Sequence, residues 1–299
     1  MKNNYKKLYG VTTAMVTPFD KDDNVNYSAV KDLTEFLISK GVHGLYPMGT
    51  TGEMIHLSVE ERKEVARTVV EHANGRAVVY IQAGGVKLKE TILLAKHAHD
   101  IGADGIGVVT PIYFKHSDRE LEEFYVTVAN SVPVDFPVYA YSIPQLSSNE
   151  LKPELLQKIA DRCPNLVGVK YSYPDMAVTD DYLRINNGTF SVLQGADLLF
   201  LPVLAMGCDG SVSGTSCVFP EAFVAVYDAF KQGNIEKARA LQIMATKCNK
   251  ITKNGNMAYY KEILKMRGID IGYMRRPFMD LPEKEAAELR EQVKKLGIL

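Results

Sequence analysis

The chain has 299 residues, more than an ordinary domain, but it suits one large α/β barrel of about 250 residues with an appendage. Its 35 lysines and arginines against 36 aspartates and glutamates give a formal net charge of −1, which argues against capture of nucleic acid or of an anionic membrane. No apolar run reaches the roughly 18 residues of a membrane helix, no apolar signal region precedes Gly10, and the four cysteines are scattered. We therefore expect a cytoplasmic protein with reduced cysteines.

Eight short apolar stretches are typical of buried strands. They are residues 10–19, 41–49, 77–84, 102–111, 136–142, 166–172, 189–195 and 207–215. Three of them, GVHGLYPMG, GADGIGVVTP and GCDGSVSGT, begin with a glycine, two residues and a second glycine. The first glycine suits a left-handed helix stop and the second a tight turn into the strand, so the spacing predicts a recurring joint between helix and strand.

Amphipathic stretches between the strands have recognisable helix starts. Ser58 with Glu61 and Ser117 with Glu120 predict capping boxes, and Pro153 suits a first helical turn. Apolar strands separated by helices indicate a parallel sheet covered on both faces, and eight such units favour closure into a barrel.

Beyond about residue 225 only helical patterns remain, and no low-complexity linker precedes them. The fold class we predict is α/β, a (β/α)₈ TIM barrel with a C-terminal helical extension. Residues 1–230 would form the catalytic barrel, and residues 231–299 would form a helical bundle packed on it.

Lys170 is the unusual residue at the carboxyl end of a predicted strand, where barrel enzymes keep their reactive groups. It is either a structural ion-pair partner of a carboxylate or an amine held in a dry pocket. In the second case burial lowers the lysine pKa and makes the neutral amine a nucleophile toward a carbonyl carbon. Lys115 is a weaker candidate because it lies in a polar stretch.

The other strand ends supply groups that could assist. Tyr141, on the adjacent strand, could move protons or could simply pack. The GTTGE turn offers backbone N–H groups and two hydroxyls to a carboxylate, although an ordinary turn has the same residues. The remaining strand ends place Tyr113, Gly195 and Asp197 at the same mouth.

Rival chemistries find little support. The six histidines fall mainly in helices or loops, which disfavours a metal-dependent aldolase or hydrolase, and we predict no metal site. The phosphate-loop, dinucleotide-binding and G-x-S-x-G motifs are missing from the sequence. A barrel without catalytic activity stays open as an alternative.

Taken together, GTTGE, TPIYF, YSIP and GVKYS, in this order and over essentially the whole chain, resemble the dihydrodipicolinate synthase / N-acetylneuraminate lyase family of pyruvate-dependent class I aldolases. The resemblance implies a (β/α)₈ barrel with a helical extension, a homotetramer built from tight dimers, and no metal or organic cofactor. It also implies that Lys170 forms a Schiff base with pyruvate or another 2-oxo acid, which the enzyme releases from or joins to an aldehyde.

The same resemblance implies further roles. Tyr141 would be the general acid/base, and Thr50 would relay protons. Tyr113 would complete the relay, commonly across a subunit contact. The turn residues Gly49, Thr50 and Thr51 would hold the substrate carboxylate, and Val212 would direct its backbone carbonyl toward the catalytic pair.

Leu146 bears on which family member this is. In the synthases an arginine at this place clamps aspartate semialdehyde, and leucine cannot make that pair. The pattern is similar to that of sialic acid lyases at Leu146, which a small hydroxyl residue follows, and at Ser172. Those lyases also hold the sugar with three polar side chains. Here Leu198 and Gly214 replace two of them, and Asp197 is kept. We therefore hypothesise a lyase of 2-oxo-3-deoxy sugar acids, or of a related 2-oxo acid, with a shorter or less hydroxylated acceptor. The alternatives are 4-hydroxy-tetrahydrodipicolinate synthase and a barrel that binds a 2-oxo acid without turnover.

Overall fold

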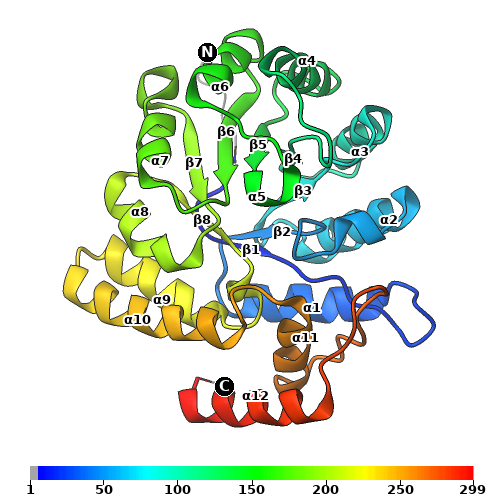
Figure 1. Cartoon of the computed structure of the whole chain (residues 1–299), viewed down its shortest axis with the longest axis vertical. Helices are drawn as coiled ribbons and strands as arrows, with labels where there is room; N and C mark the ends of the chain where they lie inside the picture. The colour runs from blue at the N-terminus through cyan, green and yellow to red at the C-terminus, as the bar shows by residue number, and fades with distance from the viewer. Residues whose placement is uncertain (1–5, 299) are drawn as a thin grey trace.

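Eight parallel strands close into a barrel in chain order in the computed structural model, which describes residues 6–298 (Figure 1). The strands are β1 (Gly10–Ala14), β2 (Gly44–Tyr46), β3 (Val78–Gln82), β4 (Gly105–Val109), β5 (Val138–Ser142), β6 (Leu166–Tyr171), β7 (Ser191–Gln194) and β8 (Gly210–Ser213). Each lies inside one of the eight predicted stretches, and β8 pairs with β1 to close the sheet. The predicted (β/α)₈ barrel is confirmed.

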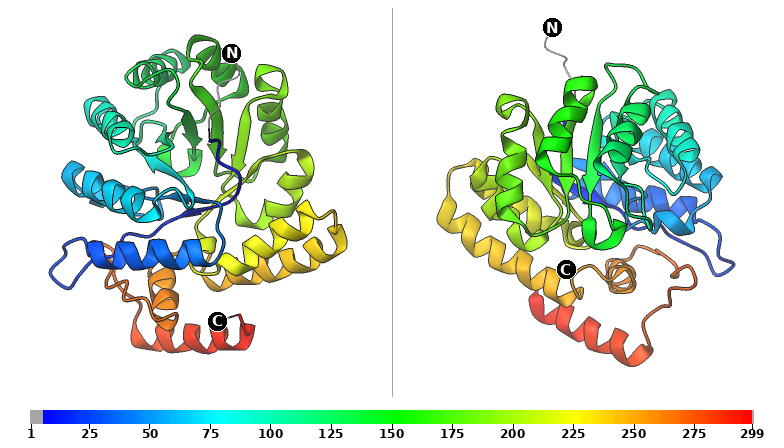
Figure 2. Two further views of the ribbon diagram at one scale, coloured as in Figure 1. Left: turned by 180° about the vertical axis from the view of Figure 1, so that it is seen from behind. Right: turned by 45° about the horizontal axis from the view of Figure 1, so that its top comes forward.

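Helices surround the barrel and continue beyond it. They are α1 (Tyr27–Ser39), α2 (Val59–Ala73), α3 (Leu88–Asp100), α4 (Asp118–Ala129), α5 (Pro144–Ser147), α6 (Pro153–Arg162), α7 (Met176–Leu183), α8 (Phe200–Met206), α9 (Pro220–Lys231), α10 (Ile235–Ile251), α11 (Met257–Met266) and α12 (Glu283–Leu296). Helix α10 packs along α9, and α11 and α12 lie together to one side of the barrel (Figure 2). The predicted domain division at residue 230 stays a prediction.

The expected helix starts are present. Ser58 and Glu61 form a reciprocal capping box at α2, and Ser117 and Glu120 form another at α4. Pro153 lies in the first turn of α6, where its missing N–H leaves no helical hydrogen bond unmade. Local sequence therefore fixes where these helices begin.

The glycine joints are confirmed in their first half and corrected in their second. Gly41, the leading glycine before β2, has φ +78°, and its counterparts before β4 and β8 are also left-handed. The second glycine makes no turn, because it is already the first strand residue. A Cβ on Gly44 would lie 2.7 Å from Thr12 Oγ1, and one on Gly105 would collide with the Tyr80 ring. Close packing between neighbouring strands, not turn geometry, requires glycine there.

Two apolar layers hold the fold together. One fills the space between the strands and the helices, and a smaller one inside the barrel includes Tyr46, Tyr80, Tyr139 and Val212. All four cysteines are buried free thiols, as predicted. Within residues 6–298, we find no helix that is both long and apolar enough to cross a membrane.

Candidate active site

Lys170 and Tyr141 are direct neighbours across the sheet. They are paired residues in the register of β5 and β6, near the carboxyl ends of both strands. Because paired residues of parallel strands project to the same face, the two side chains meet. The Nζ atom of Lys170 lies 3.9 Å from the centroid of the Tyr141 ring.

The Lys170 side chain is enclosed, with 3% of the residue exposed. Burial lowers its pKa, because the ammonium form loses its hydration. Tyr141 opposes this shift at close range, and Asp197 opposes it more weakly through space. The environment therefore favours the dry-pocket interpretation of this lysine over a structural ion pair with a carboxylate.

Tyr46 is a second aromatic neighbour that sequence reasoning missed. It is the last residue of β2, and its ring centroid lies 4.7 Å from Lys170 Nζ. Burial raises the pKa of the Tyr46 phenol well above its usual range. Its hydroxyl is buried without a hydrogen-bond partner among the described residues. Tyr46 thus encloses the amine but is poorly placed to exchange protons.

The turn after β2 brings Thr50 to Tyr141. The Thr50 Oγ1 and Tyr141 Oη atoms lie 3.3 Å apart, and either hydroxyl can donate. The Gly49 carbonyl closes the turn by accepting from Gly52 N at 3.1 Å. A side chain on Gly52 would strike the backbone of Met48 at 2.8 Å. The structure therefore brings Lys170, Tyr141 and Thr50 into one connected group.

Thr51 faces another part of the mouth. A Cβ on Gly214, just after β8, would lie 3.1 Å from Thr51 Oγ1 and 3.0 Å from the Tyr260 hydroxyl. The small residue at position 214 therefore lets the turn approach the end of β8. Val212, on β8 itself, lies inside the barrel.

Tyr113 lies apart from this group. It follows β4, has φ +77°, and is 82% exposed. Its ring packs edge to face on Phe114, with centroids 5.0 Å apart, and Phe114 is exposed as well. The predicted relay role of Tyr113 is therefore not met within a single chain.

Asp197 belongs to a buried polar cluster that includes residues the sequence did not indicate. Its Oδ2 accepts from Thr215 N at 3.3 Å and from Asn249 Nδ2, on α10, at 3.2 Å. Burial raises the pKa of the Asp197 carboxyl, and hydrogen bonds from Thr215, Ser213 and Asn249 oppose the shift. Its Oδ1 has no hydrogen-bond partner among the described residues.

The remaining predicted binding residues lie just after β6, just after β7 and in α5. Gly195 follows β7, and a Cβ there would collide with Ser172 Oγ, so the two residues touch. Leu146, in α5, is 61% exposed, whereas the hydroxyl of Ser147 donates to its own chain at Ile143 O. Leu146 can contact a ligand, and Ser147 is occupied with its helix.

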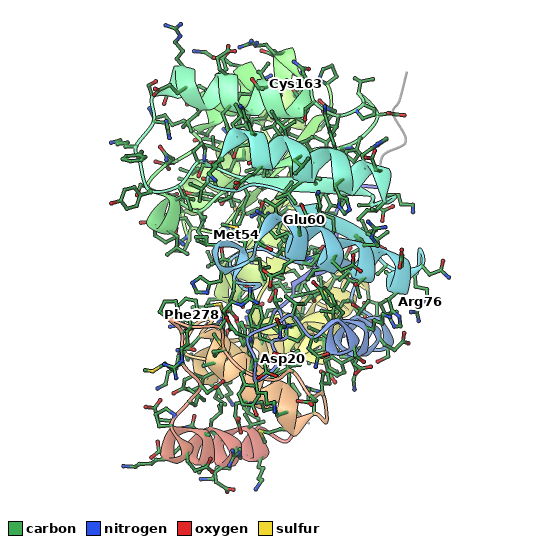
Figure 3. All side chains as sticks on the ribbon, turned by 90° about the vertical axis from the view of Figure 1, so that its right-hand side faces the viewer. Asp20, Met54, Glu60, Arg76, Cys163 and Phe278 are labelled. Atoms are coloured by element: carbon green, nitrogen blue, oxygen red, sulfur yellow. The ribbon has the colours of Figure 1, made fainter. Side chains whose placement is uncertain are left out.

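A cavity of about 270 Å³ opens beside Thr50 and Glu53. The apolar part of its wall comes from Met54, Val109, Ile143, Leu146, Met257 and Phe278. Met54, in a short 3₁₀ turn (Met54–His56), and Phe278, between α11 and α12, lie on the same side of the molecule (Figure 3). The C-terminal extension thus supplies part of the mouth.

No group of three or more histidine, cysteine, aspartate or glutamate side chains that could hold a metal ion occurs in the described part of the chain. The reactive groups described at the mouth include an amine, a phenol, hydroxyls and carboxyls. Such a set can form an imine and move protons around it.

Comparison with known proteins bears on the assignment. The dihydrodipicolinate synthetase family model matches residues 7–296. The chain belongs to this family. Its members are class I aldolases and lyases that use pyruvate, so this chain is an enzyme of that type.

Individual relatives match over nearly their full length. A DapA-like lyase of Halobacterium salinarum is 36% identical over 98% of this chain and 95% of its own. YagE, a prophage protein of the family from E. coli K12 solved in complex with pyruvate, has a TM-score of 0.92 at 30% identity, covering 98% and 99% of the two chains. A catalytic-lysine mutant of Ruminococcus gnavus sialic acid aldolase has a TM-score of 0.91 at 27% identity, covering 99% of each chain. The family model thus takes its name from a synthetase, and a sialic acid aldolase shares the fold of this chain.

Proposed function

We propose that Lys170 condenses with the 2-oxo carbon of its substrate and that the chain cleaves 2-oxo-3-deoxy sugar acids, or related 2-oxo acids, to pyruvate and an aldehyde. The observation that carries this proposal is the buried Lys170 amine beside the Tyr141 ring. Burial lowers the lysine pKa, which raises the fraction of neutral amine available to attack a carbonyl.

The proposed reaction runs through an imine. The Lys170 amine adds to the 2-oxo carbon and water leaves, giving an imine that withdraws electrons. Tyr141 takes the proton of the hydroxyl on the carbon beyond the breaking bond, the aldehyde leaves, and an enamine remains. Tyr141 then protonates the enamine, and water releases pyruvate. Thr50, 3.3 Å from the Tyr141 hydroxyl, is placed to pass these protons onward. These steps call for no metal or organic cofactor.

The wall of the cavity supports an acceptor with few hydroxyls. Leu146 presents hydrocarbon where a synthase would need a cation for the carboxylate of aspartate semialdehyde. Of the polar groups that would grip a sugar tail, the chain keeps Asp197 alone, which suits an aldehyde part with few hydroxyls. Ser172 and Gly195, in contact with each other, would border the same substrate, and Val212 would face it from β8.

The turn and the assembly complete the proposal. Gly49, Thr50 and Thr51 would hold the substrate carboxylate through backbone N–H groups and hydroxyls. Tyr113 is 82% exposed, which suits a residue that reaches the proton relay of a partner subunit. We propose a homotetramer built as a dimer of dimers, in which that exposed ring is covered.

Trapping the imine tests this function. Pyruvate and sodium borohydride should add pyruvic acid less one oxygen atom to the protein, with the adduct mapping to Lys170 in a peptide digest. The Lys170→Arg variant, folded by circular dichroism, is the control and should gain no adduct. A folded wild-type protein that gains none would reject the proposal and favour a barrel that binds without turnover.

A panel of 2-oxo-3-deoxy acids, scored for pyruvate release, tests the substrate class. Aspartate semialdehyde with pyruvate belongs in the same panel. Faster formation of dihydrodipicolinate than of any cleavage product would assign the chain to the synthases and reject our interpretation of Leu146.

A further inference from the structure

A buried ion pair joins the GTTGE turn to the C-terminal extension. Glu53 is the last residue of the turn, and Lys261 lies in the middle of α11. Lys261 Nζ is 3.2 Å from Glu53 Oε1, and the two side chains are 1% and 0% exposed. Charges that are so thoroughly desolvated attract each other strongly, and removal of one of them leaves the other buried without compensation.

Lys261 has little freedom in this position. Its ammonium also donates to the backbone carbonyl of Tyr273 at 2.5 Å and lies 4.4 Å from the centroid of the Phe19 ring. Burial lowers the Lys261 pKa, whereas Glu53 and, more weakly, Asp280 oppose the shift. The charged groups around this ammonium therefore favour the pair with Glu53.

Glu53 itself is held in an unusual backbone conformation. Its φ of +56° lies in the left-handed region, which is costly for a residue with a side chain and persists where the surroundings impose it. Its N–H donates to Thr50 O at 3.1 Å, and its Oε2 lies 3.6 Å from His56 Nδ1. The carboxylate therefore points inward to Lys261 while its backbone closes the turn that carries Thr50.

We propose that Lys261 is a positioning residue: through Glu53 it fixes the turn so that the hydroxyls of Thr50 and Thr51 face the carboxylate of a 2-oxo acid bound at Lys170. This inference rests on the proposed function, because it takes that turn as the carboxylate site. The extension beyond the barrel then contributes to substrate binding without touching the substrate.

Substrate binding at such a site is sensitive to the placement of the turn. A displacement of about 1 Å in the turn would lengthen and weaken the hydrogen bonds that it makes to the substrate. Loss of one charge-assisted hydrogen bond to the carboxylate weakens binding by about tenfold or more. A turn released from Glu53 and Lys261 should show this loss first in pyruvate binding.

Two variants separate positioning from stability. Lys261→Met leaves the Glu53 carboxylate buried without its cation and should lower both the melting temperature and pyruvate affinity. Glu53→Gln with Lys261→Met removes both charges, so no unpaired charge stays buried and the melting temperature should recover. Lys265→Met, one turn further along α11 at an exposed position, is the matched control.

The measurement is the pyruvate concentration that gives half-maximal borohydride trapping. We expect this concentration to rise about tenfold or more in both Lys261 variants, with the limiting trapping rate much less affected, and to be unchanged in Lys265→Met. If the double variant traps pyruvate at the wild-type concentration, or if affinity falls only in step with melting temperature, Lys261 serves stability alone and the proposal is overturned. A wild-type protein that forms no adduct would instead reject the proposed function.

Discussion

The Tyr141 hydroxyl is the group on which the proposed proton path depends. Tyr141→Phe keeps the ring, whose centroid lies 3.9 Å from Lys170 Nζ, and removes only Oη. General acid/base catalysis by one positioned side chain contributes about 10²- to 10⁴-fold, so we expect cleavage to slow by that factor. Pyruvate binding should change little, because the ring and the GTTGE turn are untouched.

The effect on stability should be small. One hydrogen bond that is lost, between Thr50 and Tyr141, is long at 3.3 Å, so its removal should cost no more than about 1 kcal/mol. For a chain of 299 residues that is a change of about 2 °C or less in melting temperature. A large loss of rate with a small change in melting temperature would therefore report on chemistry.

The assay is pyruvate release from the best 2-oxo acid of the panel, with thermal melting alongside. Tyr46→Phe is the matched control, because its ring also lies over Lys170 Nζ, at 4.7 Å, while its hydroxyl has no partner among the described residues. It should cleave at the wild-type rate and gain stability. A Tyr141→Phe enzyme within about threefold of wild type, or an equally slow Tyr46→Phe enzyme, would refute the assignment.

Three further predictions concern stability. Burial depresses the folded-state pKa of Lys170 below its ordinary 10.5, so the wild-type protein gains stability as the pH rises from that folded pKa toward 10.5. In urea unfolding, the stability advantage of Lys170→Met over wild type should therefore shrink across this pH range. A stability difference that stays constant with pH would contradict the prediction. Burial raises the folded-state pKa of Asp197 above 3.8, so the wild-type protein loses stability as the pH rises from 3.8 through the raised value. The stability of Asp197→Asn relative to wild type should therefore increase over that pH range and become constant above it. Urea titrations at a series of pH values would show this. Gly107→Ala should cost about 1–3 kcal/mol, because its Cβ would collide with the Tyr46 hydroxyl, and Tyr46→Phe should recover part of that loss in a double-mutant cycle.

Sequence patterns were sufficient for the barrel because its repeating unit is local. Left-handed glycines such as Gly41 end the helices before three strands, and residues such as Ser58 and Ser117 start helices through contacts three positions away. Lys170 and Tyr141 could be paired in advance because they end consecutive predicted strands, which lie side by side in a parallel barrel. The sequence could not show why position 44 must be glycine, because the side chain that a Cβ on Gly44 would strike belongs to a neighbouring strand.

The rest of the site depends on contacts between segments that are far apart in the sequence and meet only in the folded barrel. Asn249 reaches Asp197 from α10, and nothing in its own segment marks it as a site residue. Tyr46 could be predicted as part of a strand but not as a cover for Lys170. Lys261 left a faint signal: it lies three residues from both Ala258 and Leu264, on the buried stripe of an amphipathic helix, where a lysine needs a partner.

The four buried thiols bear on how the protein can be labelled. Burial raises the pKa of Cys208, Cys217 and Cys248 to about 12, and it raises the pKa of Cys163 as well. At neutral pH only about one in 10⁵ of the first three would be thiolate, the form that attacks electrophiles. Iodoacetamide and maleimides should therefore leave the native chain unmodified, and rapid alkylation would report unfolding.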